Sequence, residues 1–432
     1  MPDDTLPATG SKQTPGDASK GPLHPVRFVT AAALFDGHDA AINIMRRILQ
    51  AQGAEVIHLG HNRSVDEVVT AAIQEDAHGI AVSSYQGGHV EYFKYMIDLL
   101  RERGRPDIAV FGGGGGVIVA GEVKDLEAYG MTRVYSPEDG RRLGLQGMIA
   151  DMIQTARRDL AADLPQDLDG LTAGDPADLA RVITAIEDGR LPKTQLDAIR
   201  ATAQGRDTVP VLGITGTGGA GKSSLTDEIV RRFRFGSDEP RIAVVAIDPT
   251  RRKTGGALLG DRIRMNANNA PNVFFRSLAT RDAKTEVPPA LSDIIAAVKA
   301  AGADIVIIET PGIGQGDAGI VPFCDVSLYV MTPEFGAASQ LEKIDMLDCA
   351  DVVVSNQMDR KGAMDALRDV RKQVQRNREA FGAKPDDMPV FGAIASRFND
   401  AGVTAVYQEL LSQFTAKGFP ALPHLLPAVK SK

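Results

Sequence analysis

Residues 216–224 read Gly-Thr-Gly-Gly-Ala-Gly-Lys-Ser-Ser and follow an apolar run over 209–215. This string fits the pattern G-x-x-x-x-G-K-[ST], which is typical of a phosphate-binding loop between a strand and a helix. Small residues suit such a loop because backbone N–H groups must approach the phosphates closely. The alternative, a glycine-rich turn without catalytic meaning, does not explain the Gly-Lys-Ser ending. The residues expected to contact nucleotide phosphates are Gly218, Gly219, Ala220, Gly221, Lys222, Ser223 and Ser224.

The composition predicts a globular protein without nucleic-acid or membrane partners. The chain has 432 residues, 43% of them hydrophobic and 24% charged, which gives room for two or three domains. A net charge of −8 disfavours general affinity for nucleic acid. No apolar run approaches the roughly 20 residues that span a bilayer. With only two cysteines, Cys324 and Cys349, a disulfide framework is disfavoured, and we expect a cytoplasmic location.

Two stretches of the chain alternate short apolar runs with amphipathic segments. Alternation of this kind predicts strands joined by helices, and hence parallel sheets. The expected fold class is α/β, with two doubly wound parallel-sheet domains joined by a short helical linker. The expected boundaries are a disordered tail over 1–22, a first domain over 23–157, a linker over 158–208, a second domain over 209–417 and a tail or further linker over 418–432.

The first domain carries a three-part motif. Residues 36–41, 83–85 and 112–113 fit the pattern D-x-H-x-x-G, S-x-L and G-G, except for Ala41 and Tyr85 at two positions. Stretches of 41 and then 26 residues separate the three parts. In residues and spacing this resembles the base-off cobalamin-binding domain, which implies a flavodoxin-like fold. A single histidine would be weak evidence, but the matched spacing favours a cofactor site over a structural histidine.

The resemblance implies roles for individual residues. His38 would bind cobalt in place of the cofactor's own base, and Asp36 would hold the other ring nitrogen and so tune the ligand. Ser83 would bond the displaced base, and the glycine run 112–116 would let backbone lie against the cofactor's nucleotide tail. A flexible loop is the ordinary alternative for that run. The residues expected to contact cobalamin are Asp36, Gly37, His38, Ser83, Tyr85, Gly87, Gly88, His89, Gly112, Gly113 and Gly114.

In the second domain, acidic residues follow two predicted strands beyond the phosphate loop. They are Asp248, and Glu309 in the string Glu-Thr-Pro-Gly-Ile-Gly-Gln over 309–315. A glycine-rich stretch over 254–264 between them predicts a switch loop. Together they resemble the small G-protein family that serves methylmalonyl-CoA mutase. That resemblance implies Mg²⁺ bound by Ser223, Asp248, Asp261 and Glu309, and hydrolysis of GTP aided by Lys222, Glu309, Gln315 and Arg264.

Base recognition is expected at Asn356-Gln-Met-Asp359, where the family pattern is N-K-x-D. Asp359 can accept hydrogen bonds from both guanine donors, a pair that adenine does not present. Gln357 replaces a lysine that packs along the base and bonds the ribose and the phosphate loop, so it bears on affinity. Ala395 and Ser396 fit the backbone contact to guanine O6.

The order of the two domains resembles that of the fused isobutyryl-CoA mutases, in which a substrate-binding TIM barrel follows both. The resemblance implies that GTP and GDP binding with Mg²⁺ gates the loading and release of adenosylcobalamin. The expected partners are a mutase barrel in cis or in trans, a second copy of the chain and a cobalamin adenosyltransferase. Without a barrel, this chain is not expected to isomerise an acyl-CoA by itself.

Two other functions remain open at this point. The first is a non-catalytic cobalamin carrier or sensor with a nucleotide-impaired G domain, which the replacement of lysine by Gln357 favours. The second is a metal-insertion GTPase unrelated to cobalamin, which His38 and the matched spacing disfavour.

Overall fold

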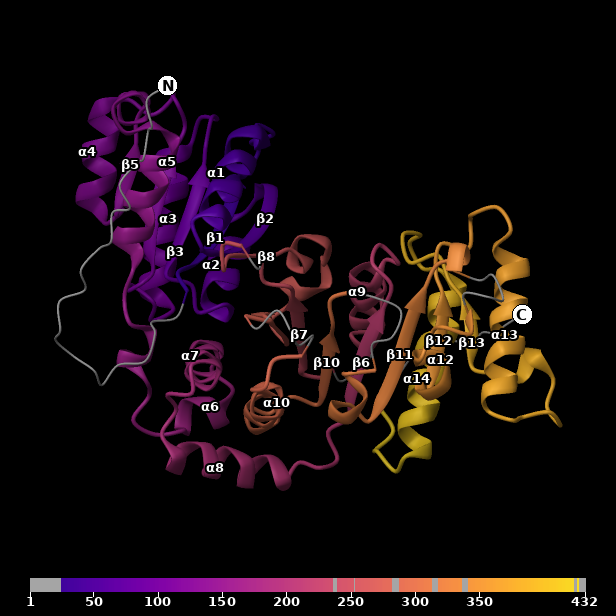
Figure 1. The fold of residues 1–432 in the computed structure, drawn as a ribbon. Helices are drawn as coiled ribbons and strands as arrows, with labels where there is room; N and C mark the ends of the chain where they lie inside the picture. Colours follow the sequence, from indigo (N-terminus) through magenta and orange to yellow (C-terminus); the bar gives the residue numbers. More distant parts are fainter. Residues whose placement is uncertain are drawn as a thin grey trace, which may run out of the picture.

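The computed structural model describes residues 25–235, 239–251, 253–281, 287–312, 318–335, 341–422 and 426, without the side chains of residues 39, 163 and 261. Two parallel sheets dominate these residues, which confirms the expected α/β class (Figure 1). The expected tail over 1–22 lies outside the described residues. Within them, no helix is both long and apolar enough to cross a membrane.

The first sheet is built mainly from the N-terminal part of the chain, in the strand order β5-β4-β3-β1-β2-β8. Its strands are buried because helices cover both faces, as in other parallel sheets. The elements of this domain are β1 (Arg27–Ala33), α1 (Asp39–Ala51), β2 (Glu55–Arg63), α2 (Val65–Gln74), β3 (Gly79–Ser83), α3 (His89–Glu102), β4 (Ala109–Gly113), α4 (Ala120–Tyr129), β5 (Arg133–Tyr135) and α5 (Pro137–Ala156).

The linker consists of three short helices that pack against the second sheet. These are α6 (Asp169–Ala173), α7 (Pro176–Glu187) and α8 (Lys193–Gln204). Ile183 of α7 and Ile199 of α8 are fully buried in one apolar cluster with strand residues of that sheet. The linker is therefore part of the core of the second domain, and Figure 1 shows it running beneath both domains.

The second sheet has seven strands in the order β13-β12-β11-β6-β10-β7-β9. Its central strands are also buried on both faces. The elements are β6 (Val211–Gly216), α9 (Lys222–Phe233), β7 (Ile242–Asp248), β9 (Val273–Ala279), α10 (Leu291–Ala300), β10 (Ile305–Glu309), β11 (Val326–Met331), α12 (Met346–Cys349), β12 (Val352–Ser355), α13 (Ala363–Asn377), β13 (Val390–Gly392) and α14 (Ala401–Ala416).

One strand departs from the expectation. The sequence predicts a switch loop over 254–264, but residues Ala257–Leu259 form strand β8. This strand belongs by chain order to the second domain, yet it pairs in parallel with β2 of the first (Figure 1). Local sequence did not predict this strand because its backbone groups find partners on a strand some 200 residues earlier. That the segment acts as a switch stays a prediction.

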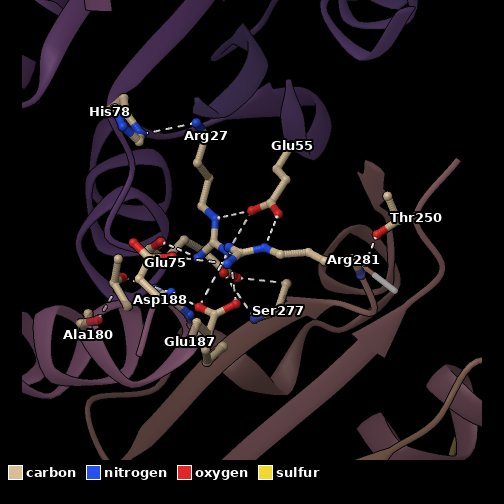
Figure 2. Close-up of polar contacts among 12 residues, drawn as sticks. Arg27, Glu55, Glu75, His78, Ala180, Glu187, Asp188, Thr250, Ser277 and Arg281 are labelled. Carbon is tan, nitrogen blue, oxygen red and sulfur yellow. Dashed lines mark hydrogen bonds and ion pairs between the residues drawn. The ribbon is translucent and has the colours of Figure 1, made fainter. Parts of the chain in front are cut away.

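Buried charges join the first domain, the linker and the second domain (Figure 2). Glu55 accepts hydrogen bonds from Arg27 Nε at 3.0 Å and from Arg281 Nε at 3.0 Å. Glu75 accepts from the backbone N–H and the hydroxyl of Ser277, each at 2.9 Å. Its side chain is fully buried and also lies 3.3 Å from Arg262 Nη1. Since each carboxylate has partners on another segment, the charges hold the segments in one arrangement.

Replacing Glu75 with Ala should destabilise the chain by about 3–5 kcal/mol, because it leaves buried donors and a buried guanidinium without their partner. The measurement is urea unfolding followed by circular dichroism. Asp365→Ala is the matched control, because its pair with Arg368 is 76% and 60% exposed and should contribute less than about 1 kcal/mol. Equal effects of the two substitutions would contradict a structural role for the network.

Candidate functional sites

The loop after β1 holds the predicted His38 and Asp36. The Asp36 side chain is fully buried, whereas that of His38 is 68% exposed. Asp36 Oδ1 lies 2.9 Å from His38 Nδ1 and also accepts the His38 backbone N–H at 2.9 Å. Asp36 Oδ2 accepts the Tyr85 backbone N–H at 2.6 Å. Because the carboxylate holds Nδ1, the ring is oriented so that Nε2 is the nitrogen available to a metal.

The carboxyl group of Asp36 must be ionised to accept these hydrogen bonds. Burial by itself raises the pKa of its carboxyl, but the hydrogen bonds from Tyr85 and His38 outweigh burial, so the pKa lies below its ordinary value. The carboxylate is therefore ionised at neutral pH and can accept both N–H groups and the imidazole proton.

A cavity of about 210 Å³ opens between α1, α5 and the ends of β3 and β4. The predicted Ser83, Tyr85 and Gly112–Gly114 lie in its wall, together with apolar side chains such as Met148. Ser83 Oγ is buried and has no hydrogen-bond partner among the described residues. An unpartnered hydroxyl in an apolar cavity suits a heterocyclic ligand with one hydrogen-bonding atom, so these residues fit the displaced base of cobalamin.

The glycine run is packed, which argues against a flexible loop. A Cβ on Gly114 would lie 1.9 Å from the Ser84 carbonyl oxygen. The Ser84 N–H in turn donates to the Gly113 carbonyl at 2.8 Å. Glycine is needed here because the end of β3 and the chain after β4 touch through their backbones.

Besides Asp36 and His38, which contact Tyr85 of the wall, four predicted cofactor contacts do not lie in the wall of this cavity. Gly37 is exposed in the His38 loop, and Gly87 and Gly88 precede α3, with Gly88 at φ +84°. His89 is buried, with Nε2 3.0 Å from Glu122 Oε2 and Nδ1 3.2 Å from the Gln86 carbonyl. Because protein groups occupy both ring nitrogens, this histidine anchors the start of α3, and the structure does not bring it to the cavity.

A second cavity, of about 300 Å³, lies at the carboxyl ends of β6, β7 and β10. It brings together residues 218–224 of the phosphate loop, except Ala220, with Asp248, Arg264 and Glu309. The predicted Gln315 and the side chain of Asp261 lie outside what the structure describes. Leu258 and Thr310 also line this cavity, and local sequence did not single them out.

The phosphate loop wraps tightly around Lys222. Its ammonium group is buried and donates to the carbonyls of Gly216 at 3.2 Å and Thr217 at 3.3 Å. A Cβ on Gly312 would lie 2.5 Å from Lys222 Nζ, so glycine lets the chain after β10 approach the lysine. The loop thus presents a positive charge and the start of α9 to the same small space, as an anion site requires.

Glu309 is buried beside the start of α9. Its Oε1 accepts from the Ser223 hydroxyl and its Oε2 from the Thr226 hydroxyl, both at 2.8 Å. Sequence reasoning missed Thr226, which is fully buried one turn after Ser223. The spacing of three residues, which puts two side chains on the same face of a helix, was the available signal. Two hydroxyls fix the orientation of the carboxylate at the cavity.

The predicted base-recognition residues contact the phosphate loop. Asn356 is buried, donates through Nδ2 to the Ala220 carbonyl at 2.7 Å and accepts the Ala395 N–H at 2.9 Å. Gln357, at φ +61°, donates through Nε2 to the Gly219 carbonyl at 2.9 Å. The amide thus bonds a loop carbonyl, which is one of the contacts expected of the family's lysine. Asp359 and Ser396 are exposed nearby.

This second cavity has the chemistry of a phosphate and magnesium site. Hydroxyl and carboxylate oxygens are the ligands that Mg²⁺ prefers, and Ser223, Asp248 and Glu309 supply them at one cavity. Lys222 and Arg264 supply positive charge in the same wall. The residues present therefore fit a nucleotide with its metal ion.

Comparison with known proteins identifies the families that both domains resemble. Residues 179–417 match the family described as methylmalonyl Co-A mutase-associated GTPase MeaB, and residues 26–132 match the B12 binding domain. The fused isobutyryl-CoA mutase of Cupriavidus metallidurans is 64% identical over 98% of this chain and 39% of its own length. The proteins of that name from Nocardia farcinica and Geobacillus kaustophilus are 62% and 59% identical over 95% and 92% of this chain, and 38% and 37% of their own lengths.

This chain spans about two fifths of the length of these relatives. The match to the GTPase family covers more than half of its residues and includes the phosphate loop, Asp248, Glu309 and the base-recognition residues. The chain therefore belongs to the family of methylmalonyl-CoA mutase-associated GTPases of the MeaB type, and it carries a B12-binding domain on the N-terminal side of its GTPase domain.

Proposed function

We propose that this chain is the cofactor-handling region of an adenosylcobalamin-dependent acyl-CoA mutase, in which GTP hydrolysis gates the loading and release of adenosylcobalamin. The observation that carries the proposal is the presence, in one chain, of the Asp36–His38 pair beside an apolar cavity and of a phosphate loop beside Glu309. The relatives named fused isobutyryl-CoA mutase support interconversion of isobutyryl-CoA and n-butyryl-CoA as the activity of the whole protein.

In the cobalamin domain, His38 would hold cobalt through Nε2, while Asp36 fixes the tautomer through its contact with Nδ1. Ser83 bonds the displaced base inside the cavity, whose apolar wall excludes water. The glycines 112–114 and Tyr85 shape this cavity for the nucleotide tail. When bound, the cofactor supplies the radical that starts the rearrangement, and these residues supply binding and orientation.

In the GTPase domain, Lys222 and the phosphate-loop N–H groups bind the β- and γ-phosphates. Ser223, Asp248, Asp261 and Glu309 would hold Mg²⁺, and Arg264 would stabilise charge that develops during hydrolysis. Gln315 is proposed to aid hydrolysis of GTP. Asp359 and the 395–396 backbone read guanine.

The surface at the cobalamin cavity suggests a partner for this chain. Two exposed apolar side chains lie at the cobalamin site: Leu145, in the cavity wall, is 45% exposed, and Phe35, directly before Asp36, is 78% exposed. An apolar rim of this kind suits a mutase barrel that closes over the cofactor, in cis or in trans. We also propose that the chain associates with a second copy of itself and receives the cofactor from an adenosyltransferase. The proposed location is the cytoplasm.

Two observations favour this function over the alternatives. Gln357 bonds the phosphate loop through Gly219, which removes much of the reason to regard the GTPase site as impaired. The match to the B12 binding domain disfavours a metal-insertion GTPase unrelated to cobalamin.

Replacing His38 with Ala should weaken cobalamin binding at least tenfold, because loss of a group that orients a ligand typically costs 10–100-fold and here the ligand itself is removed. The measurement is titration with adenosylcobalamin followed by visible absorption, in which imidazole coordination of cobalt has its own spectrum. The matched control is His61→Ala, since His61 is exposed at the end of β2 and lies outside the cavity wall. A His38→Ala variant with the spectrum and affinity of the unmodified chain would contradict the assignment.

The unmodified chain should bind Mg-GDP and Mg-GTP at least 100-fold more tightly than Mg-ADP in calorimetric titrations. Asp359→Asn should lose about 100-fold in GDP affinity, because hydrogen bonds to a charged group contribute about 1.5–3 kcal/mol each. Gln357→Lys should change affinity less than about tenfold, since the loop contact already exists. Binding that appears only after lysine is restored would point to the carrier or sensor function.

Replacing Thr226 with Val should lower GTP turnover about tenfold, because Glu309 loses one of the two hydroxyls that orient it while side-chain volume is kept. Thr226→Ser, which retains the hydroxyl, should restore most of the rate. The measurement is steady-state phosphate release, with Kd for Mg-GTP determined in parallel. A rate loss of equal size in both variants would show that Thr226 acts only through packing.

A further inference from the structure

Strand β8 is part of both domains. Ala257, Leu258 and Leu259 pair with Glu55, Val56 and Ile57 of β2, and the Ala257 N–H donates to the Ala54 carbonyl at 3.2 Å. By chain order the same strand begins only nine residues after Asp248 of the GTPase site. A segment between two elements of the GTPase domain therefore completes the edge of the cobalamin domain's sheet.

Side chains of β8 alternate between the two domains, as the period of a strand requires. Ala257 and Leu259 are fully buried in the apolar core of the cobalamin domain, together with Ile57. Leu258 points the other way and lines the nucleotide cavity beside Asp248 and Glu309. One strand is therefore a wall of the nucleotide cavity and a part of the other domain's core.

The end of β8 also holds a carboxylate of the proposed magnesium site. The Gly260 N–H donates to Asp248 Oδ2 at 3.0 Å. On the other side of β8, Thr250 forms an antiparallel bridge with Ala257, and the Arg251 N–H donates to the Gly256 carbonyl at 2.9 Å. These contacts tie the carboxylate of Asp248 to the end of β8, and Thr250 and Arg251 to its start.

An ion pair fixes the hairpin that Thr250 and Arg251 form with β8 to the first residue of β2. The Thr250 hydroxyl accepts the Arg281 N–H at 2.8 Å, and Arg281 Nε donates to Glu55 Oε1 at 3.0 Å (Figure 2). Arg281 also pairs with Glu187 and Asp188 of the linker, at 3.3 and 3.2 Å. The hairpin is thus held by backbone pairing and by buried charge.

The other end of β2 reaches the cobalamin loop. Asn62, in the left-handed region at φ +55°, accepts the Phe35 N–H through Oδ1 at 2.9 Å. Phe35 directly precedes Asp36, and β1 pairs with β2 up to Ala33. The two ends of one nine-residue strand therefore contact the hairpin at the nucleotide cavity and the loop that carries His38.

We propose that β8 positions Asp248 for the metal ion only while it is paired with β2, so that nucleotide binding and cobalamin binding change each other's affinity through this strand pair. The inference rests on the proposed function, because it needs both ligands. It goes beyond that function by naming the strand pair, with Gly260 and Asn62 at its ends, as the element that both sites bias. Coupling of this kind is reciprocal and is measured as one factor from either side.

The test is a binding cycle on the full chain. Kd for Mg-GDP is measured with and without saturating adenosylcobalamin, and Kd for adenosylcobalamin with and without saturating Mg-GDP. We expect the same factor, about fivefold or more, in both directions. Binding of both ligands with a factor of one would overturn the inference. The proposed function would still stand, because gating by hydrolysis acts on the rates of cofactor loading and release, which this cycle does not measure. Failure of the chain to bind either ligand would instead overturn the proposed function, and the inference with it.

Two substitutions test the path. Asn62→Gly removes the acceptor of the Phe35 N–H and tolerates the positive φ, so the coupling factor should fall to within about twofold of one while the fold is kept. Asn62→Asp keeps an acceptor oxygen and should keep the factor. Ala257→Pro removes the N–H that bonds Ala54 and should both abolish coupling and raise Kd for Mg-GDP about tenfold.

If Ala257→Pro does not fold, the Asn62 pair decides alone. A coupling factor that stays at the unmodified value in Asn62→Gly would overturn the role of the strand pair. Hydrogen exchange gives a second measurement: Mg-GDP should slow exchange of the amides of residues 55–63 as well as those of the GTPase domain. Slowing confined to the GTPase domain would also overturn it.

Discussion

Three buried carboxylates, those of Glu55, Glu75 and Glu187, lie where the two sheets and the linker meet, and their partner arginines come from different segments. A charge out of water is costly unless an opposite charge and hydrogen bonds surround it. Neither domain supplies all of those partners, because Arg27 belongs to the first and Arg276 and Arg281 to the second. The need to pair these charges therefore sets how the two domains are arranged. That arrangement in turn sets where the cobalamin site lies relative to the nucleotide site.

Within that arrangement, both sites use the same architectural position. The His38 loop follows β1, which lies between β3 and β2, and the phosphate loop follows β6, which lies between β11 and β10. Each is the point where connections leave the sheet in opposite directions, and where parallel α/β sheets bind ligands. One site is apolar and suits a heterocycle, whereas the other is lined by charge and backbone N–H groups and suits phosphate.

The sequence predicted those features of the fold and the sites that depend on short-range patterns in the chain. The phosphate loop, the Asp36–His38 pair and the two parallel sheets depend on residues close together in the chain, or on spacings that a family pattern records. Thr226, Leu258 and the partners of Glu75 were missed because their contacts join residues far apart: Glu309 and Thr226 are separated by 83 positions, and Ser277 and Glu75 by 202. His89 was predicted to contact the cofactor because it follows the end of a strand, but its ring contacts Glu122 on another helix.

The outer position of β8 in the first sheet has a consequence for the cobalamin domain as a separate piece. Cut away from residue 209 onward, that domain would present the backbone of β2 along an open edge, with an apolar recess where Ala257 and Leu259 had been. Open edges with unpaired backbone groups and nearby apolar surface associate with strands of other molecules. A cobalamin domain of this kind would self-associate when produced alone. Its solubility therefore depends on the GTPase domain, whose strand β8 covers this edge.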